Sequence, residues 1–426
     1  RIDNIVNSRL SNATITEDGY IIPGDGTEVE CLNLDTLKIE SNKIKSFVKR
    51  TSPEKILSIK TRSGRFIKTT KYHPLFILKD NEVVEARADE LKQGVRIAVP
   101  RKLNFIPEHK FFTELLDEIK EDDKIYIPYS EEYKLILLSI KGDLTWKQLS
   151  DKIGISHYVI KGLLDKQSIN LFYLINILKY ANLSDLEIIK LINQLISNGK
   201  KTNFNFQNSA EFSRFFGYLL AEGRLANSSQ IWFTNGDKEI VEDYIQLVKK
   251  LFNKSPLVRE YKPRCWDVII FSESLKKILN KLGMSSNTEN KKISNIFLKH
   301  SSEKEISELL NGLYCGDGYV SKSSIEITTK SQKLARGIEI CLLRLGILFS
   351  TKDQIKGIKS SCVSGNYKTI VISGVNNFIK FHQDIKLIHQ SKNRRILNYL
   401  SKKSNPNLDL IEINTLIKEI SKEQNI

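Results

Sequence analysis

Two short stretches of the chain place a carboxylate directly before a glycine, at the end of an apolar run with helical spacing. In "RFFGYLLAEG" the acid is Glu222, and in "LLNGLYCGDG" it is Asp317. The dipole at a helix C-terminus disfavours a carboxylate by about 0.3–1 kcal/mol, and two neighbouring carboxylates also repel each other. A divalent cation reverses both penalties. Mg²⁺ takes carboxylate and phosphate oxygens in phosphodiester hydrolysis, so the two acids predict a shared Mg²⁺ site.

Small residues in the same two stretches indicate how the acids could meet. They recur at positions i and i+4, which would let two helices pack backbone to backbone. The residues are Gly217, Ala221, Gly312 and Gly316. The glycines after the acids, Gly223 and Gly318, are expected in the left-handed conformation that ends a helix. For one stretch alone, a solvated acid at an ordinary helix end is the simpler interpretation; two copies in matching frames favour the metal site.

The region around these stretches, residues 201–400, contains an internal duplication. In each copy the acid-ending helix precedes a strand, a second helix and a further strand pair. Glu222 lies 50 positions before Ser272, and Asp317 lies 56 positions before Ser373. The pattern predicts the order αββαββα twice, in two α/β halves related by a pseudo-twofold axis.

Composition narrows the class of partner. The 426 residues carry a formal charge of +16, and the isoelectric point is about 9.3. Nucleic acid is therefore the first candidate partner and a membrane surface the second. No apolar run approaches the roughly 18 residues of a membrane span. The five cysteines lack CxxC spacing, so we expect reduced thiols in an intracellular, cytoplasmic protein.

The remaining chain divides by pattern into three further segments. Residues 1–104 are β-rich, with hairpin turns at Ser63-Gly64 and Asp80-Asn81 and a last strand in "GVRIAVPRKL". Residues 105–200 have helical spacing and end at the turn signal Asn198-Gly199, after which "KKTNFNFQNS" is expected to be a polar linker. Residues 401–426 form a C-terminal tail with a short amphipathic helix.

The duplicated region resembles the LAGLIDADG homing endonucleases in their single-chain form, on the strength of "FFGYLLAEG" and "LNGLYCGDG" over about residues 210–390. The resemblance implies that Glu222 and Asp317 coordinate Mg²⁺. It also implies that each half lays a curved antiparallel sheet over a long, asymmetric double-stranded DNA site, the protein being monomeric. The family uses one lysine per half near the site. Lys262 and Lys368, which precede corresponding strands, are the candidates, and Lys330 is a rival.

The N-terminal segment resembles the Hint domain of inteins. A strand, a Ser-Gly turn, a second strand and the block "TKYHP" lead to "ADELKQGVRIAVP". The resemblance implies that Thr70 and His73 polarise a peptide bond at a splice junction with a flanking host protein. The chain opens "RIDNIVNSRL" and ends "SKEQNI", without the terminal nucleophile or the final His-Asn of an intein. We therefore expect a fragment truncated at both junctions that does not splice as it stands.

Within the helical segment, "LTWKQLSDKIGISHYVIKGLL" has the layout of a helix-turn-helix. Leu149 is expected on the first helix, Gly154 in the turn and Ser156 at the cap of the second. The core positions of the second helix are Val159, Ile160, Leu163 and Leu164. His157, Tyr158 and Lys161 would then face the DNA major groove. An ordinary helical hairpin is the alternative.

These features together predict a multidomain protein: a β-rich Hint-type part, a small helix-turn-helix domain and a pseudo-symmetric α/β endonuclease. The favoured function is a site-specific, metal-dependent DNA homing endonuclease embedded in a self-splicing intein. A non-cleaving DNA-binding regulator and a splicing element with a decayed nuclease remain as alternatives.

Overall fold

The computed structural model describes residues 2–51, 55–80, 82–107, 110–206, 208–226, 229–357 and 364–401. The chain separates into two compact units, the first ending at Asn104 and the second beginning at Phe105. Among the described residues, no helix has both the length and the apolar character that crossing a membrane requires.

The first unit consists mainly of short antiparallel strands, as its alternating sequence predicts. One helix, α1 (Ile2–Asn7), packs Val6 against Ile22 and Phe47 in a small core. The strands pair as β1-β2-β5, β3-β4, β6-β7 and β8-β9. Their bounds are β1 (Thr14–Thr16), β2 (Gly19–Pro23), β3 (Glu28–Leu32), β4 (Ile39–Lys43), β5 (Ser46–Arg50), β6 (Leu57–Lys60), β7 (Phe66–Thr69), β8 (Pro74–Lys79) and β9 (Glu82–Arg87).

Turn residues explain where these strands end. Gly64, with φ of 84°, lies in the turn between β6 and β7, and Asp80, with φ of 50°, lies between β8 and β9. Asn81 lies outside the described residues. The strand expected in "GVRIAVPRKL" is reduced to a single bridge between Ile77 and Ile97. Gly94 turns the chain just before it, and Pro100 has no N–H to donate after it, so few residues remain to pair.

The second unit opens with helices, as expected for residues 105–200. They are α2 (Phe111–Asp117), α3 (Glu131–Lys141), α4 (Trp146–Ile153), α5 (His157–Leu164), α6 (Leu171–Tyr180) and α7 (Asp185–Leu191). The pattern did not predict the antiparallel sheet that accompanies them, ordered β11-β10-β12-β13. Its strands are β10 (Tyr126–Ile127), β11 (Ile169–Asn170), β12 (Gln194–Ser197) and β13 (Lys200–Asn203). Asn198 and Gly199 form the turn between β12 and β13 with positive φ.

The prediction of a polar linker after Gly199 is wrong. Strand β13 pairs with β12, and Phe204 and Phe206 beyond it are 1% and 0% exposed. The two rings lie 4.6 Å apart and contact Phe112 of α2. Alternation places both phenylalanines on one side of an extended segment, so burying them outweighs the polar residues between them.

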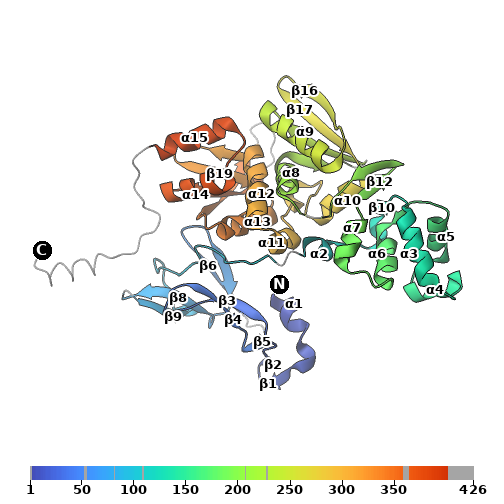
Figure 1. Cartoon of the computed structure of the whole chain (residues 1–426). Helices are drawn as coiled ribbons and strands as arrows, with labels where there is room; N and C mark the ends of the chain where they lie inside the picture. The colour runs from blue at the N-terminus through green and yellow to red at the C-terminus, as the bar shows by residue number, and fades with distance from the viewer. Residues whose placement is uncertain are drawn as a thin grey trace, which may run out of the picture. The chain divides into compact units, whose positions relative to one another are not determined.

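Two similar α/β halves complete the unit, in the predicted order αββαββα (Figure 1). The first half contains α8 (Ala210–Glu222), β14 (Gly223–Leu225), β15 (Gln230–Asn235), α9 (Lys238–Phe252), β16 (Leu257–Lys262), β17 (Cys265–Phe271) and α10 (Glu273–Lys281), followed by α11 (Asn295–His300). The second contains α12 (Glu303–Gly316), β18 (Gly318–Val320), β19 (Ser324–Thr329), α13 (Gln332–Arg344), β20 (Ser350–Gly357), β21 (Ser364–Ser373) and α14 (Val375–Ile385), followed by α15 (Gln390–Leu400). The two sheets have the same antiparallel order, β14-β15-β17-β16 and β18-β19-β21-β20.

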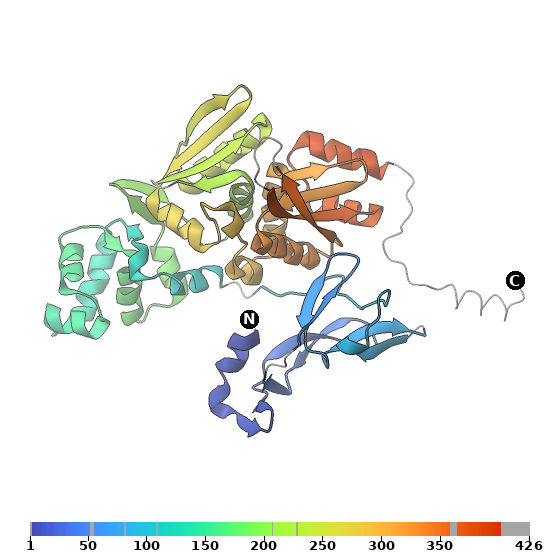
Figure 2. The same ribbon diagram turned by 180° about the vertical axis from the view of Figure 1, so that it is seen from behind.

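The central helices α8 and α12 lie side by side where the halves meet (Figures 1 and 2). A Cβ atom on Gly217 would come within 2.2 Å of the Leu309 carbonyl oxygen, and one on Gly312 within 2.3 Å of the Arg214 oxygen. One on Gly316 would lie 2.6 Å from the Ala221 Cβ. The predicted stripe of small residues therefore does bring the two helix backbones into contact.

Candidate active site at the paired helix ends

The two predicted acids lie at the ends of these central helices. Glu222 is the last residue of α8, and Asp317 is the C-cap of α12. Each is followed directly by a strand, β14 or β18, so the chain leaves the helix and enters the sheet within one residue. Both acidic side chains are exposed to solvent and accessible to a ligand.

The expectation of left-handed glycines after the acids is wrong. Gly223 has φ of −84°, in the extended region, and Gly318 is not among the residues with positive φ. A Cβ on Gly223 would lie 2.6 Å from the Leu219 oxygen, and one on Gly318 would lie 2.3 Å from the Tyr314 oxygen. Glycine is needed here because the strand folds back closely on the helix it leaves.

The electrostatics of the two carboxyl groups reflect their crowded setting. Desolvation on its inner side raises the pKa of Glu222 to about 7, and the charge of Asp317 adds to the rise. Desolvation also raises the pKa of Asp317, while Lys291 and Lys392 oppose the rise at both acids. Solvent reaches both side chains and screens their repulsion, so the raised pKa values do not imply a large loss of folding stability. They indicate instead that a positive charge would be favoured between the two carboxyl groups.

Two lysines outside the predicted set cap the acid-bearing helices. The Lys291 ammonium donates to the carbonyl oxygens of Leu219, Leu220 and Ala221 at 3.3, 2.9 and 3.2 Å. Lys291 is 3% exposed, and burial lowers its pKa to about 8. All three of its N–H groups are engaged, so in this structure it offsets the negative helix end and has no proton free for a ligand.

Lys392 of α15 does the same for the second half. Its ammonium donates to the carbonyl oxygens of Tyr314, Cys315 and Gly316 at 2.9, 2.7 and 3.3 Å. Burial lowers the pKa of Lys392 as well. The site thus combines two acids and two lysines, one of each from either half.

The structure gives each of the two predicted lysines a different neighbour. Lys262 ends the outer strand β16, with its ammonium 5.2 Å from the centre of the Tyr261 ring. Lys368 lies on β21, with its ammonium 3.9 Å from a carboxylate oxygen of Asp353. They do not precede corresponding strands, because β16 matches β20 and not β21 in the sheet order.

Lys330, the rival, lies beyond β19, with its ammonium 5.4 Å from the centre of the Tyr367 ring. Spacing could have identified the capping lysines: Lys291 follows Glu222 by 69 positions, and Lys392 follows Asp317 by 75. That offset of six equals the one between the distances to Ser272 and Ser373.

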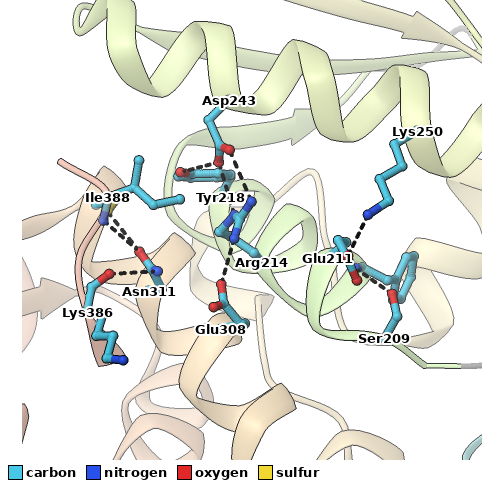
Figure 3. A network of polar contacts seen from close by, with 12 residues as sticks. Ser209, Glu211, Arg214, Tyr218, Asp243, Lys250, Glu308, Asn311, Lys386 and Ile388 are labelled. Carbon is cyan, nitrogen blue, oxygen red and sulfur yellow. Dashed lines mark hydrogen bonds and ion pairs between the residues drawn. The ribbon is translucent and has the colours of Figure 1, made fainter. Parts of the chain in front are cut away.

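A charged network joins the two halves through the central helices (Figure 3). Arg214 of α8 donates to Asp243 of α9 through two nitrogens at 3.0 and 3.1 Å, and to Glu308 of α12 at 2.9 Å. The Tyr218 hydroxyl donates to Asp243 at 2.9 Å. Because Arg214 bridges helices of both halves, it fixes the crossing on which the separation of the acids depends.

A second contact in Figure 3 positions the segment that carries Lys392. The Asn311 side chain of α12 donates to the Lys386 carbonyl at 3.3 Å and accepts from the Ile388 N–H at 3.4 Å. These bonds secure the chain between α14 and α15 against the helix that ends near Asp317.

The donor set fits a divalent cation of the magnesium type. Within the described ranges, no group of three or more His, Cys, Asp or Glu side chains could enclose a metal. The protein ligands at this site would then be the two carboxylates of Glu222 and Asp317. Mg²⁺ is commonly held by one or two carboxylates, with water and phosphate oxygens completing its shell.

The predicted splicing residues occupy a tight turn of the first unit. Thr70 and His73 lie between β7 and β8, where the His73 N–H donates to the Thr70 carbonyl at 3.2 Å. The His73 carbonyl accepts from the Ala88 N–H at 3.0 Å, which ties the turn to the end of β9. The His73 side chain is exposed, and Thr70 is half-buried.

The predicted recognition residues lie on the exposed side of α5. Gly154 takes the left-handed conformation after α4, and the Ser156 hydroxyl caps α5 by accepting from the Tyr158 N–H. His157, Tyr158 and Lys161 are exposed, with Tyr158 at 82%. The buried positions of the helix pair include Leu149, Ile155, Ile160 and Leu163.

The protein is therefore pseudo-symmetric. Each of its two α/β halves contributes one carboxylate to a site at the adjacent ends of α8 and α12. The chain belongs to the intein splicing domain family, whose model matches residues 1–389. It is 26% identical over 428 residues to the glutamine–fructose-6-phosphate aminotransferase of Methanocaldococcus jannaschii, covering 95% of this chain and 37% of that protein. It is 22% identical to the replication factor C small subunit of Thermococcus kodakarensis, covering 88% of this chain and 31% of that protein. The chain thus spans about a third of the length of these relatives.

Solved structures similar to parts of the chain include an intein and a homing endonuclease. The PabCDC21-1 intein is 33% identical over 24% of this chain and 62% of its own, with a TM-score of 0.23. The homing endonuclease I-DmoI, in complex with DNA and Mn, is 14% identical over 46% of this chain and all of its own, with a TM-score of 0.31. TM-scores this low establish no common fold, so the family assignment rests on the sequence match.

Proposed function

We propose that this intein-family chain is a site-specific DNA endonuclease that cuts both strands of a duplex with the help of Mg²⁺. The observation that carries the proposal is the pair of acids at adjacent helix ends, each helix capped by a lysine through three carbonyls. Without a bound cation, two carboxylates at adjacent helix ends are disfavoured by the helix dipoles and by their mutual repulsion.

Each residue of the site has a distinct role in this proposal. Glu222 and Asp317 would hold the metal, which supplies Lewis acidity and a deprotonated water for phosphodiester hydrolysis. Lys291 and Lys392 are positioning residues: they neutralise the helix ends and oppose the rise in the pKa of both acids, which favours their ionised form. Arg214 maintains the distance between the halves.

Other parts of the chain would bind the DNA or act in splicing. The positive charge and the exposed face of α5, with His157, Tyr158 and Lys161, support a helix-turn-helix contact in the major groove. Two halves in one chain suit a monomer on a long, asymmetric site.

We assign residues 1–104 to a Hint-type part, 105–200 to the helix-turn-helix domain, 201–400 to the nuclease and 401–426 to a tail. Thr70 and His73 would polarise the amide that joins the intein to its host protein.

A cleavage selection tests the proposal. The full chain is incubated with a library of duplexes carrying a randomised insert, in Mg²⁺ or in EDTA, and the cut ends are sequenced. We expect a recurrent cut site in Mg²⁺ and none in EDTA. Glu222→Gln and Asp317→Asn should retain binding and lose cutting, whereas Glu242→Gln, an exposed glutamate paired with Lys238 on α9, should cut normally.

The outcomes separate the alternatives. Cutting by the double variant of Glu222 and Asp317 would show that the acids are misassigned. Binding without cutting by the parent chain would favour a regulator. Lys291→Met should slow cutting and shift its pH profile upward, because the pKa of Glu222 then rises further. If Lys262→Met or Lys368→Met abolishes cutting and Lys291→Met does not, the lysine roles proposed here are wrong.

A further inference from the structure

The first-half sheet carries a stack of two arginines on one tryptophan. Arg224 lies on β14, Trp232 on β15 and Arg259 on β16. The guanidinium carbons lie 4.3 and 4.6 Å from the centre of the Trp232 ring. Ile231 and Phe233, which alternate with Trp232, are fully buried on the opposite face. The stack therefore belongs to the face of the sheet that does not form the core.

A buried carboxylate fixes one of the arginines in a defined orientation. Asp267 of β17 is 3% exposed and accepts from the Arg259 Nε at 3.2 Å and from the Thr234 hydroxyl at 2.6 Å. The contact with Asp267 uses the Nε of the guanidinium and leaves its two terminal nitrogens, on a side chain that is 50% exposed, for another partner. Two terminal N–H groups in a rigid fork match the O6 and N7 acceptors of guanine in the major groove.

The stack reduces what binding would cost. A free arginine loses side-chain entropy when it is ordered against a base, at about 0.5–1.5 kcal/mol per immobilised side chain. Arg259 is already restrained by the Trp232 ring and by Asp267, and Arg224 by the ring alone. The two arginines also cover the Trp232 ring, which is only 9% exposed, and they present ordered guanidinium groups that suit a planar, polar partner.

The second half differs at the same register positions. Tyr319 pairs with Glu326 as Arg224 pairs with Trp232, and Lys352 pairs with Thr369 as Arg259 pairs with Asp267. The Thr369 hydroxyl is engaged with that of Thr328 at 2.9 Å. These positions hold no arginine, and a lysine there is a flexible point charge without the fork.

We propose that Arg224 and Arg259, positioned by Trp232 and Asp267, form a guanine-reading site confined to the first half of the nuclease. The inference rests on the proposed DNA-cleaving function and specifies its target: two guanines are read in the half-site under the first sheet, and none by the equivalent positions of the second. The two half-sites of the target would then differ in which bases the protein reads.

Selection of bound DNA tests the inference apart from cutting. The full chain selects from a randomised duplex library in EDTA, and the enriched sequences are compared among variants. We expect guanine at two positions of one half-site. Arg259→Lys, which keeps the charge, should reduce the preference at one position by about 5- to 150-fold, and Arg224→Lys should do so at the other. Lys238→Gln, a charge removed from the exposed surface of α9, should leave both preferences intact.

Asp267→Asn tests the positioning role. It should weaken the guanine preference at the Arg259 position while the average affinity for DNA and the urea midpoint stay close to the parent. A parent motif without guanine in either half, or an Arg259→Lys variant with the full preference, overturns the inference and leaves the nuclease proposal standing. A chain that enriches no sequence refutes sequence-specific DNA binding, and with it both proposals.

Discussion

Replacing Gly312 by alanine should lower the free energy of unfolding of the second unit by about 2 kcal/mol. The new Cβ would lie 2.3 Å from the Arg214 oxygen and 2.8 Å from the Tyr218 nitrogen. Both are backbone atoms of α8, so no side chain can swing aside, and the helices must separate by about 1 Å to reach ordinary contact. Overpacking of this kind costs about 1–3 kcal/mol, here at the upper end, and the better helix propensity of alanine returns up to about 1 kcal/mol.

Urea unfolding followed by tryptophan fluorescence measures this effect in the right unit, because Trp146, Trp232 and Trp266 all lie beyond Asn104. Gly162→Ala in α5 is the matched control. Its Cβ would meet only the flexible Gln167 side chain, at 3.2 Å, so that variant should gain about 0.5–1 kcal/mol. A Gly312→Ala variant as stable as the parent would refute the close packing of α8 on α12. The same variant should also cut more slowly, since separating the helices separates the acids.

Three further predictions follow from the charged residues. The pKa of Glu222 is raised from 4.5 to about 7 in the folded state. Between these two pH values the folded state binds the proton more tightly than the unfolded state does, so the free energy of unfolding should fall as the pH rises from about 4.5 to about 7. Glu222→Gln should flatten that profile in urea titrations; an unchanged profile would contradict the shift. Arg214→Met removes the cation that pairs with the partly buried carboxylates of Asp243 and Glu308 and should cost about 2–3 kcal/mol. The exposed Lys238→Met should cost less than about 0.5 kcal/mol, and equal losses would show that the network is not a tie between the halves. Lys161→Ala should weaken binding to all duplexes and reduce the salt slope of binding by about one, and an unchanged slope would exclude a phosphate contact by Lys161.

Local patterns were sufficient to predict many of the helices, strands and turns of this protein, although not the sheet of β10 to β13. Helical spacing, capping serines and turn residues predicted α4 and α5, the Asn198-Gly199 turn and the order of the two halves, because each depends on residues close in the chain. The same reasoning failed for Phe204 and Phe206, whose polar neighbours resemble a linker. Their burial depends on a pocket of aromatic rings formed by residues far from them in the sequence.

The same contrast between local and long-range information applies to the acids and lysines of the site. Glu222 and Asp317 could be identified from the sequence, because each acid, its glycine and the small residues before it lie within about two helical turns. Lys291 and Lys392 could not be selected from a local pattern, since Lys and Arg number 66 and the caps form across 70 to 78 positions. Only their matching spacing from the two acids could have identified them. The conformation of Gly223 also escaped local rules, because the strand after it folds back on its own helix.

The sequence by itself thus determined which residue types are repeated, in what order the elements run, and that two helices could pack closely enough to bring two carboxylates together. The tertiary structure decided which lysines balance those carboxylates and which arginines are held rigid on the sheet. The physical reason is that a helix end or a cation can take any partner of opposite charge within reach, and only the folded chain determines which partner that is.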